Sequence, residues 1–104
     1  MFDKQLHLET KLFKGFADKS RLAILKTILT GPKTVSEIVA ATKLSQPNTS
    51  IHLACLLDCG LVGKEKKGRE VFYRISSREI KKVIAGAQNI LNDHGKEISN
   101  CTRY

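Results

Sequence analysis

Helix-breaking and helix-capping residues cut the middle of this chain into short segments, and their positions constrain the fold more than any other feature. The dipeptide Gly31-Pro32 ends a helical pattern of apolar residues, since proline cannot continue a helix. Thr34-Val35-Ser36-Glu37 has the spacing of a capping box, which predicts that a short helix begins there. Ser45 can cap a further helix with Pro47 in its first turn, and Gly60 is placed to end it. We therefore expect two short helices separated by a tight turn.

Longer elements are predicted on either side of this helix pair. Apolar residues at helical spacing predict an N-terminal helix over residues 2–16. Leu61-Val62 and Val71–Ile75 are typical of two short strands, which a glycine turn would join into a hairpin. Ser76 and Glu79 form a second capping box, and the helix that it opens is expected to end at Gly95. The expected fold is mainly α with a small β-hairpin, in the order of a winged helix-turn-helix.

The charge balance narrows the function. The chain carries 18 Lys and Arg against 10 Asp and Glu, a formal net charge of +8. Such an excess on a small domain favours a polyanionic partner such as nucleic acid, although charge that serves solubility alone is the alternative. The sequence has no membrane-length apolar run and no apolar signal-peptide core at its N-terminus, so we expect a cytoplasmic protein without a membrane partner. It also lacks a phosphate-binding glycine loop, an HExxH motif and a recognisable base for a cysteine nucleophile, so we do not expect an enzyme.

The second helix of the pair and the hairpin tip are the expected contacts to double-stranded DNA. In a helix-turn-helix this helix lies in the major groove, and its N-terminal side chains reach base edges. A basic hairpin tip can reach neighbouring phosphates, although an ordinary solvated turn has a similar composition. The expected DNA-binding residues are Gln46, Asn48, Thr49, Ser50 and His52 in the helix, and Lys66, Lys67 and Arg69 in the hairpin. For His52, packing within the fold and metal ligation are alternatives that the sequence leaves open.

Two of the three cysteines lie on the helix that is expected to bind DNA. Cys55 and Cys59 are four residues apart, so their thiols stand one above the other on a face opposite the leucines of this helix. Two such thiolates can converge on one soft metal ion, which then requires a third ligand. Cys101 is the evident candidate for that ligand, and His52 is a weaker one. The alternative interpretation is that another element or a partner chain simply covers the two thiols.

Three motifs resemble the ArsR/SmtB family of metalloregulatory repressors, and together they cover most of the chain. They are Asp18-x-x-Arg21-Leu22-Ala23-Ile24-Leu25, Leu44-Ser45-Gln46-Pro47-Asn48-Thr49-Ser50-Ile51-His52-Leu53 and Gly68-Arg69-Glu70-Val71-Phe72-Tyr73. Within that family, His52-Leu53-x-Cys55-Leu56-x-Asp58-Cys59-Gly60 with a cysteine in the C-terminal tail is similar to the CmtR-type cadmium and lead sensors.

The resemblance implies a homodimer held by its first and last helices, with a trithiolate site formed by Cys55, Cys59 and Cys101 and with Cys101 donated across the dimer. We expect a DNA-binding and dimerisation domain over residues 1–95, and a flexible tail over residues 96–104 that carries the third ligand. The expected function is repression of transcription by a homodimer that leaves operator DNA when Cd(II) or Pb(II) binds, with Zn(II) as a further candidate effector. A thiol redox-responsive or arsenite-responsive repressor on the same fold is the alternative.

Overall fold

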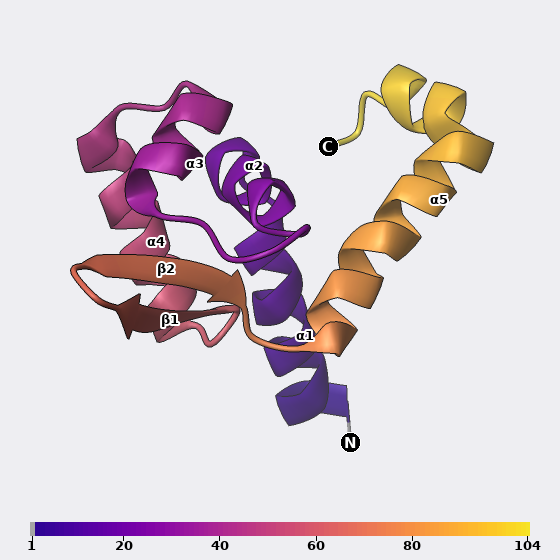
Figure 1. The fold of residues 1–104 in the computed structure, drawn as a ribbon. Coiled ribbons are helices and arrows are strands. Elements are labelled where there is room, and N and C mark those ends of the chain that lie inside the picture. The colour runs from indigo at the N-terminus through magenta and orange to yellow at the C-terminus, as the bar shows by residue number, and fades with distance from the viewer. Residues whose placement is uncertain (1) are drawn as a thin grey trace.

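The structure is a computed structural model that describes residues 2–104. Within this range it has five helices and one antiparallel hairpin (Figure 1): α1 Phe2–Phe16, α2 Lys19–Thr27, α3 Val35–Thr42, α4 Gln46–Asp58, β1 Val62–Lys67, β2 Glu70–Ile75 and α5 Arg78–Asn100. This order confirms the predicted winged helix-turn-helix, mainly α with a small hairpin. None of the described helices is long and apolar enough to cross a membrane.

The core lies where α2, α3 and α4 pack against the base of the hairpin. α4 contributes Leu53 and Leu56 to it, whereas α5 reaches it only near its N-terminal end, through Ile80 and Ile84. The buried apolar side chains that form the core are Ile24, Leu25, Ile28, Ile38, Leu53, Leu56, Leu61, Val62, Ile75 and Ile84. The helix pair and the hairpin therefore share one apolar core.

Local capping fixes α3 and α4 where the sequence predicts it. The Thr34 hydroxyl accepts a hydrogen bond from the Glu37 N–H at 3.2 Å, and the Glu37 carboxylate accepts one from the Thr34 N–H at 2.9 Å. The Ser45 hydroxyl accepts from the Asn48 N–H at 3.1 Å. Gly60, two residues after the end of α4, has a φ of 78°, which glycine adopts at little steric cost. These bonds confirm both predicted helix starts.

The start of α5 differs from the prediction by one residue. Its N-cap is Ser77, whose hydroxyl accepts a hydrogen bond from the Ile80 N–H at 3.4 Å. Ser76 instead donates its N–H to the Leu61 carbonyl at 3.1 Å. The predicted capping box at Ser76 is therefore wrong, because this serine still belongs to the end of the hairpin.

α5 also continues past Gly95, the residue expected to end it. The helix bends at His94, where φ is −124° and ψ is 18°, and then resumes as far as Asn100. Gly95 does not take the positive φ that glycine usually has when it ends a helix. Residues 96–100 are therefore helical, and the segment without regular structure begins at Cys101 rather than at residue 96.

A short backbone bridge joins the hairpin to the start of the helix pair. β1 and β2 pair in antiparallel register over their whole length. Lys33, just before α3, exchanges two backbone hydrogen bonds with Tyr73 in β2, at 3.0 and 2.8 Å. The direction of the hairpin is thereby tied to the segment that enters α3.

A single arginine holds α1 against α2. Arg21 donates from Nε to the Gly15 carbonyl at 3.1 Å and from Nη2 to the Lys14 carbonyl at 2.9 Å. These carbonyls lie at the C-terminal end of α1, where helices leave such groups without partners. Asp18 caps α2 by accepting the Arg21 N–H at 3.0 Å. The Arg21 side chain thus ties the end of α1 to the start of α2.

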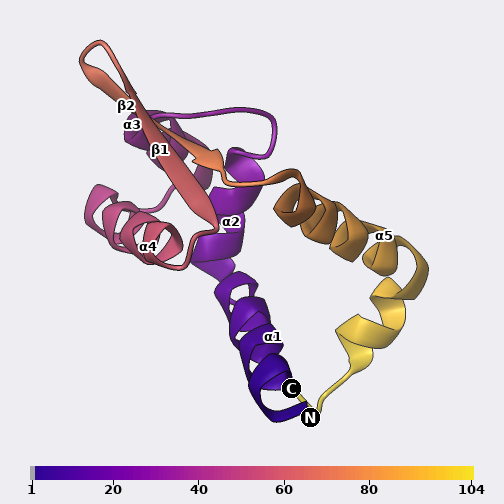
Figure 2. The same ribbon diagram turned by 90° about the horizontal axis from the view of Figure 1, so that it is seen from below.

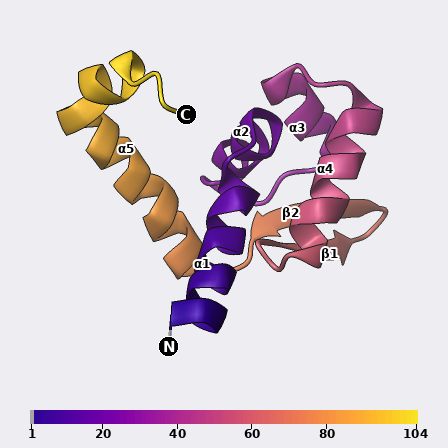
Figure 3. The same cartoon turned by 180° about the vertical axis from the view of Figure 1, so that it is seen from behind.

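α1 and α5 project away from this body, as Figure 2 shows, and Figures 1 and 3 show the two helices diverging from each other beyond the start of α5. The radius of gyration is 15.1 Å, whereas a compact chain of 100 residues has one of about 13 Å. Large apolar side chains are exposed along both helices: Phe2, Leu6, Leu8, Leu12 and Phe13 in α1, and Val83, Ile90, Leu91 and Ile98 in α5. A single chain would leave this apolar surface in water.

Candidate nucleic-acid interface and metal centre

The N-terminal half of α4 presents neutral hydrogen-bonding groups to solvent. Three of the expected DNA-binding residues, Gln46, Asn48 and Ser50, are exposed there. The helix carries a single carboxylate, Asp58, which lies at its C-terminal end. Nothing on the exposed N-terminal half of α4 would therefore repel a phosphate backbone.

The prediction that Thr49 contacts DNA is wrong. Its side chain is 0% exposed, and its hydroxyl donates a hydrogen bond to the Ser45 carbonyl at 2.8 Å. Thr49 precedes Leu53 by four residues, about one helical turn, so both fall on the face that packs against the core. The Thr49 side chain thus supports the first turn of α4 and cannot reach a base.

His52 is half-buried. The backbone N–H of Arg21 holds the pKa of the Asp18 carboxyl below its ordinary value, with smaller contributions from the charges of Arg21 and His52. His52 therefore lies near a carboxylate at the α1–α2 junction. DNA contact, packing and metal ligation stay the three roles predicted for it.

The hairpin tip carries the remaining expected DNA contacts, Lys66, Lys67 and Arg69, all exposed. The Lys67 ammonium lies 3.6 Å from the Glu65 carboxylate, whereas Lys66 and Arg69 make no ion pair with the described residues. In Figures 1 to 3 the tip and α4 both lie on the side of the molecule away from α5. This arrangement allows one DNA duplex to meet both elements.

Cys55 and Cys59 come together at the C-terminal end of α4. Cys55 is half-buried and Cys59 is exposed, and the Cys59 N–H donates to the Cys55 carbonyl at 3.0 Å. Partial burial raises the pKa of the Cys59 thiol, as do the charge of Cys55 and a hydrogen bond between the two thiols, while Lys11 and Arg21 oppose this rise. The two thiols therefore lie next to each other at this end of α4, as the spacing in the sequence predicts.

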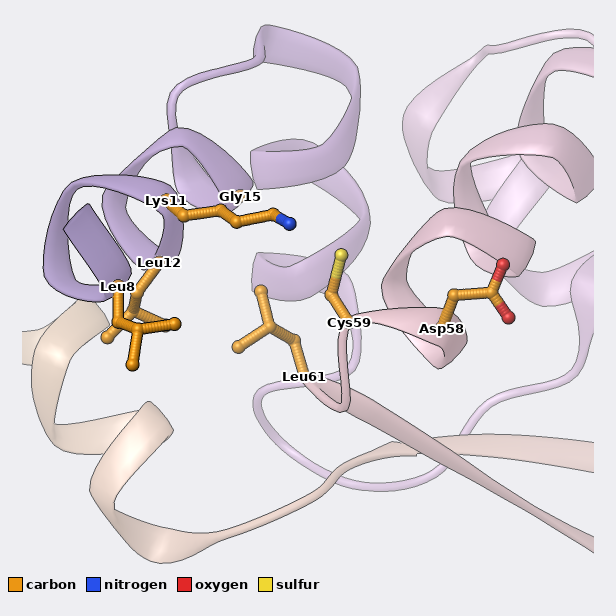
Figure 4. Close-up of a pocket in the computed structure, with 7 residues that line it drawn as sticks. All are labelled: Leu8, Lys11, Leu12, Gly15, Asp58, Cys59 and Leu61. Carbon is orange, nitrogen blue, oxygen red and sulfur yellow. The ribbon is translucent and has the colours of Figure 1, made fainter. Parts of the chain in front are cut away.

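The Cys59 thiol opens into a pocket between α1 and the end of α4 (Figure 4). The pocket has a volume of about 340 Å³, and its lining residues are Leu8, Lys11, Leu12, Gly15, Asp58, Cys59 and Leu61. In Figure 4 the Lys11 ammonium and the Cys59 sulfur point toward the same space, whereas the Asp58 carboxylate points away. An anionic group that formed at Cys59 would thus lie near a positive charge.

Cys101 does not join the other two cysteines within one chain. It is the C-cap of α5 and is half-buried. Figures 1 and 3 show the C-terminal end of α5 across α2 from α4. Among residues 2–104 no three His, Cys, Asp or Glu side chains lie close enough together to hold a metal ion. A three-cysteine site would therefore need a thiol from a second chain or a large movement of α5.

Ile51 is an outward-facing apolar residue that is not among the expected DNA-binding residues. Its side chain is 65% exposed, and Pro47 and Ala54, one turn away on either side, are exposed as well. Helix geometry could have predicted this exposure, because a residue two positions from Leu53 lies about 200° around the helix from it. Burial of Leu53 therefore turns Ile51 toward solvent.

Comparison with known sequences identifies related proteins. Residues 18–64, which run from the α2 N-cap into β1, match the model of the family described as "Bacterial regulatory protein, arsR family". A probable mercury resistance operon repressor from Streptomyces lividans is 33% identical over 93 residues, which cover 89% of this chain and 74% of that protein.

Two solved structures have the same architecture over nearly their whole length. Reduced HlyU from Vibrio cholerae N16961 matches with a TM-score of 0.78 and 35% identity, covering 86% of this chain and 94% of that one. The homodimeric winged helix-turn-helix DNA-binding domain Mb0332 from Mycobacterium bovis, described as a possible ArsR-family transcriptional regulator, matches with a TM-score of 0.80 and 27% identity. That match covers 89% of this chain and 86% of the Mb0332 fragment.

Proposed function

The chain belongs to the ArsR family of bacterial regulatory proteins and is a transcriptional regulator, and from this premise we propose that it is a homodimeric repressor that leaves its operator when Cd(II) or Pb(II) binds. The membership confirms the resemblance predicted from the motifs. One observation carries the proposal: α4 bears exposed hydrogen-bonding side chains in its N-terminal half and two adjacent thiols at its C-terminal end. A ligand at one end of this helix can therefore act on a DNA contact at the other.

Gln46 and Asn48 are the proposed base-reading residues. Both are exposed at the first turn of α4, the part of a recognition helix that approaches base edges. Their amide side chains can make paired hydrogen bonds to N6 and N7 of adenine. Ser50 adds a hydroxyl to the same half of the helix, and the three basic residues of the hairpin tip supply phosphate contacts. His52, which is half-buried, stays a proposed DNA contact, with packing and metal ligation as its alternatives.

The exposed apolar faces of α1 and α5 support a homodimer formed through these helices. A groove of about 180 Å³ between α1, α2 and α5 has apolar walls that include Phe13, Leu22, Val83 and Leu91. Side chains of a second copy would fill it and cover the projecting helices. The homodimeric Mb0332 domain supports the same assembly. Two-fold symmetry then predicts a palindromic operator with half-sites about one helical turn, or a multiple of one, apart.

Cys55, Cys59 and the partner subunit's Cys101 are the proposed metal ligands. The first two thiols are adjacent on α4, and two sulfurs leave a soft ion short of donors. Within residues 2–104 the same chain brings no third His, Cys, Asp or Glu ligand to them, which supports donation across the dimer. When bound, Cd(II) or Pb(II) supplies strong bonds to deprotonated thiols and so favours the thiolate form.

Ligation would weaken DNA binding in two ways. Three thiolates on one divalent ion carry a net charge of −1 where neutral thiols stood before, on a helix that faces phosphates. A link from α4 to the partner subunit would also fix the direction of this helix relative to its counterpart. The metal then favours a conformation that holds DNA poorly, which is the differential binding that such a response requires. A coupling of about 1–3 kcal/mol would lower the affinity roughly 5- to 150-fold.

Fluorescence anisotropy with the DNA upstream of the protein's own gene tests the proposal. Reduced wild-type protein should bind tightly and should be released by stoichiometric Cd(II) or Pb(II), with Zn(II) and Hg(II) titrated in parallel. Cys101→Ser should bind metal-free DNA as the wild type does and should lose the metal response. Ser99→Ala, an exposed neighbour in α5, is the matched control and should keep it. Tight binding that no metal changes would contradict the metal-responsive part of the proposal.

The same assay separates the thiol redox and arsenite alternatives. HlyU, to which the chain is similar, is described in one solved structure as reduced. In this chain the exposed Cys59 thiol lies next to Cys55, so oxidation at this pair is the second candidate trigger. Release by peroxide with loss of free thiols, and no release by Cd(II), would favour that trigger. Release by arsenite alone would favour the arsenite-responsive alternative.

A further inference from the structure

We propose that Ile51 reads thymine in the operator by packing against the C5-methyl group in the major groove. The proposal rests on the proposed function, because it requires α4 to lie in that groove. It adds an apolar contact to a surface on which the other proposed base contacts are hydrogen bonds, and it makes Ile51 a specificity-determining residue.

The exposure of Ile51 sets it apart from the other large apolar residues of α4. Its side chain is 65% exposed, whereas those of Leu53 and Leu56 are each 1% exposed. Single exposed apolar side chains are common on protein surfaces, so exposure alone identifies no partner. The position matters more: Ile51 lies in the N-terminal half of the helix, with exposed Pro47 and Ala54 beside it. A narrow apolar strip thus runs along the outward face of α4.

The charges around this strip select the kind of partner. The first three turns of α4 contain no acidic residue, and the hairpin tip beside it is rich in lysine and arginine. The larger apolar surfaces of the molecule lie on α1 and α5, away from the N-terminal half of α4 and from the hairpin tip (Figure 2), so Ile51 is not part of them. A partner that is polyanionic and also presents apolar groups fits this face, and the thymine methyl gives the major groove such a group.

The spacing to Asn48 places this contact next to a hydrogen-bonding one. Asn48 and Ile51 are three residues apart, so they are neighbours on the helix surface. An A·T pair shows N6 and N7 of adenine and the methyl of thymine in the same groove. The two side chains can therefore read one A·T pair or two adjacent ones. The β-branched Ile51 side chain is also stiff in a helix, so it loses little freedom when it makes the contact.

Replacing thymine by deoxyuridine removes only the methyl group and so tests the proposal directly. Each thymine of the footprinted operator is replaced in turn, in both half-sites together, and the affinity is measured by anisotropy. Burial of one methyl is worth about fourfold in affinity, so one symmetric pair of thymines should cost the wild type about 15-fold when replaced. Ile51→Ala should lose similar affinity for the natural operator and should be indifferent to that replacement.

Lys66→Ala is the matched control, because it removes a proposed phosphate contact. That contact does not depend on the thymine methyl group. This variant should bind more weakly at every sequence and should keep the full sensitivity to deoxyuridine. Equal sensitivity in the wild type and in Ile51→Ala would overturn the proposal, as would an operator in which no thymine methyl matters. Failure of the wild type to bind any operator would overturn the proposed function and this inference with it. Circular dichroism establishes that Ile51→Ala is folded, which its exposed position predicts.

Discussion

Lysine 66 offers a quantitative test of how the hairpin meets DNA. Its side chain is exposed at the tip and makes no ion pair within the described residues. Each phosphate contact that is lost reduces the salt slope of log affinity by about 0.9, and a homodimer loses two contacts when Lys66 becomes alanine. The slope should therefore fall by about 1.8. Between 50 and 200 mM salt, the ratio of wild-type to variant affinity should shrink by about tenfold.

Lys67 is the internal comparison, because its ammonium already lies 3.6 Å from the Glu65 carboxylate. Part of its charge is offset before DNA arrives, so Lys67→Ala should change the slope less than Lys66→Ala does. The assay is anisotropy of the operator at four or more salt concentrations for the wild type and both variants. An unchanged slope in Lys66→Ala would refute the phosphate contact. A slope in Lys67→Ala that falls as much as in Lys66→Ala would refute the role given to the Glu65 ion pair.

Three further predictions address the fold and the assembly. Thr49→Val removes the hydroxyl that donates a hydrogen bond to the Ser45 carbonyl. It should lower the free energy of unfolding in urea by about 1 kcal/mol without altering which bases are preferred. A changed base preference would contradict the burial of Thr49. The Thr34 N–H holds the pKa of Glu37 below its ordinary value of 4.5. The ionised Glu37 carboxylate therefore stabilises the fold above pH 4.5, and this stabilisation is lost as the pH falls through the folded-state pKa. Glu37→Gln should therefore flatten the loss of stability below pH 4.5 in acid titrations followed by circular dichroism, and an unchanged profile would argue against the capping bond in solution. Ile90 is 54% exposed in one chain, so Ile90→Glu should fold but elute as an 11.6 kDa monomer in light-scattering chromatography, where the wild type has twice that mass; a dimeric variant would place the interface elsewhere.

Features that depend on one helical turn could be predicted from the sequence. The Thr34–Glu37 box and the Ser45 cap each need only neighbouring backbone groups, so residue type and spacing determine them. The adjacency of Cys55 and Cys59 follows from helix geometry in the same way. These local features were enough to predict the order of the elements and the winged helix-turn-helix.

Features that depend on packing between elements could not be predicted in this way. Ser76 and Ser77 both suit a helix start, and the hydrogen bond from Ser76 to Leu61 decides between them. Thr49 is polar, yet the angle at which α4 packs turns it into the core. Gly95 is a typical helix end, but the helix bends at His94 and continues. Cys101 can be named as a ligand from its residue type, whereas its place relative to α4 depends on the course of α5.

The two hydrogen bonds from Arg21 to the end of α1 have a consequence for operator length. In the proposed dimer, α1 lies at the interface, and α2 packs against the helix pair that approaches DNA. The α1–α2 junction that Arg21 holds would therefore set the distance between the two copies of α4. This junction would then determine the spacing between the two half-sites, while α4 determines which bases are read in each half-site. A more flexible α1–α2 junction would let the dimer accept half-sites one base pair nearer or farther apart. The sequence read inside each half-site would stay the same.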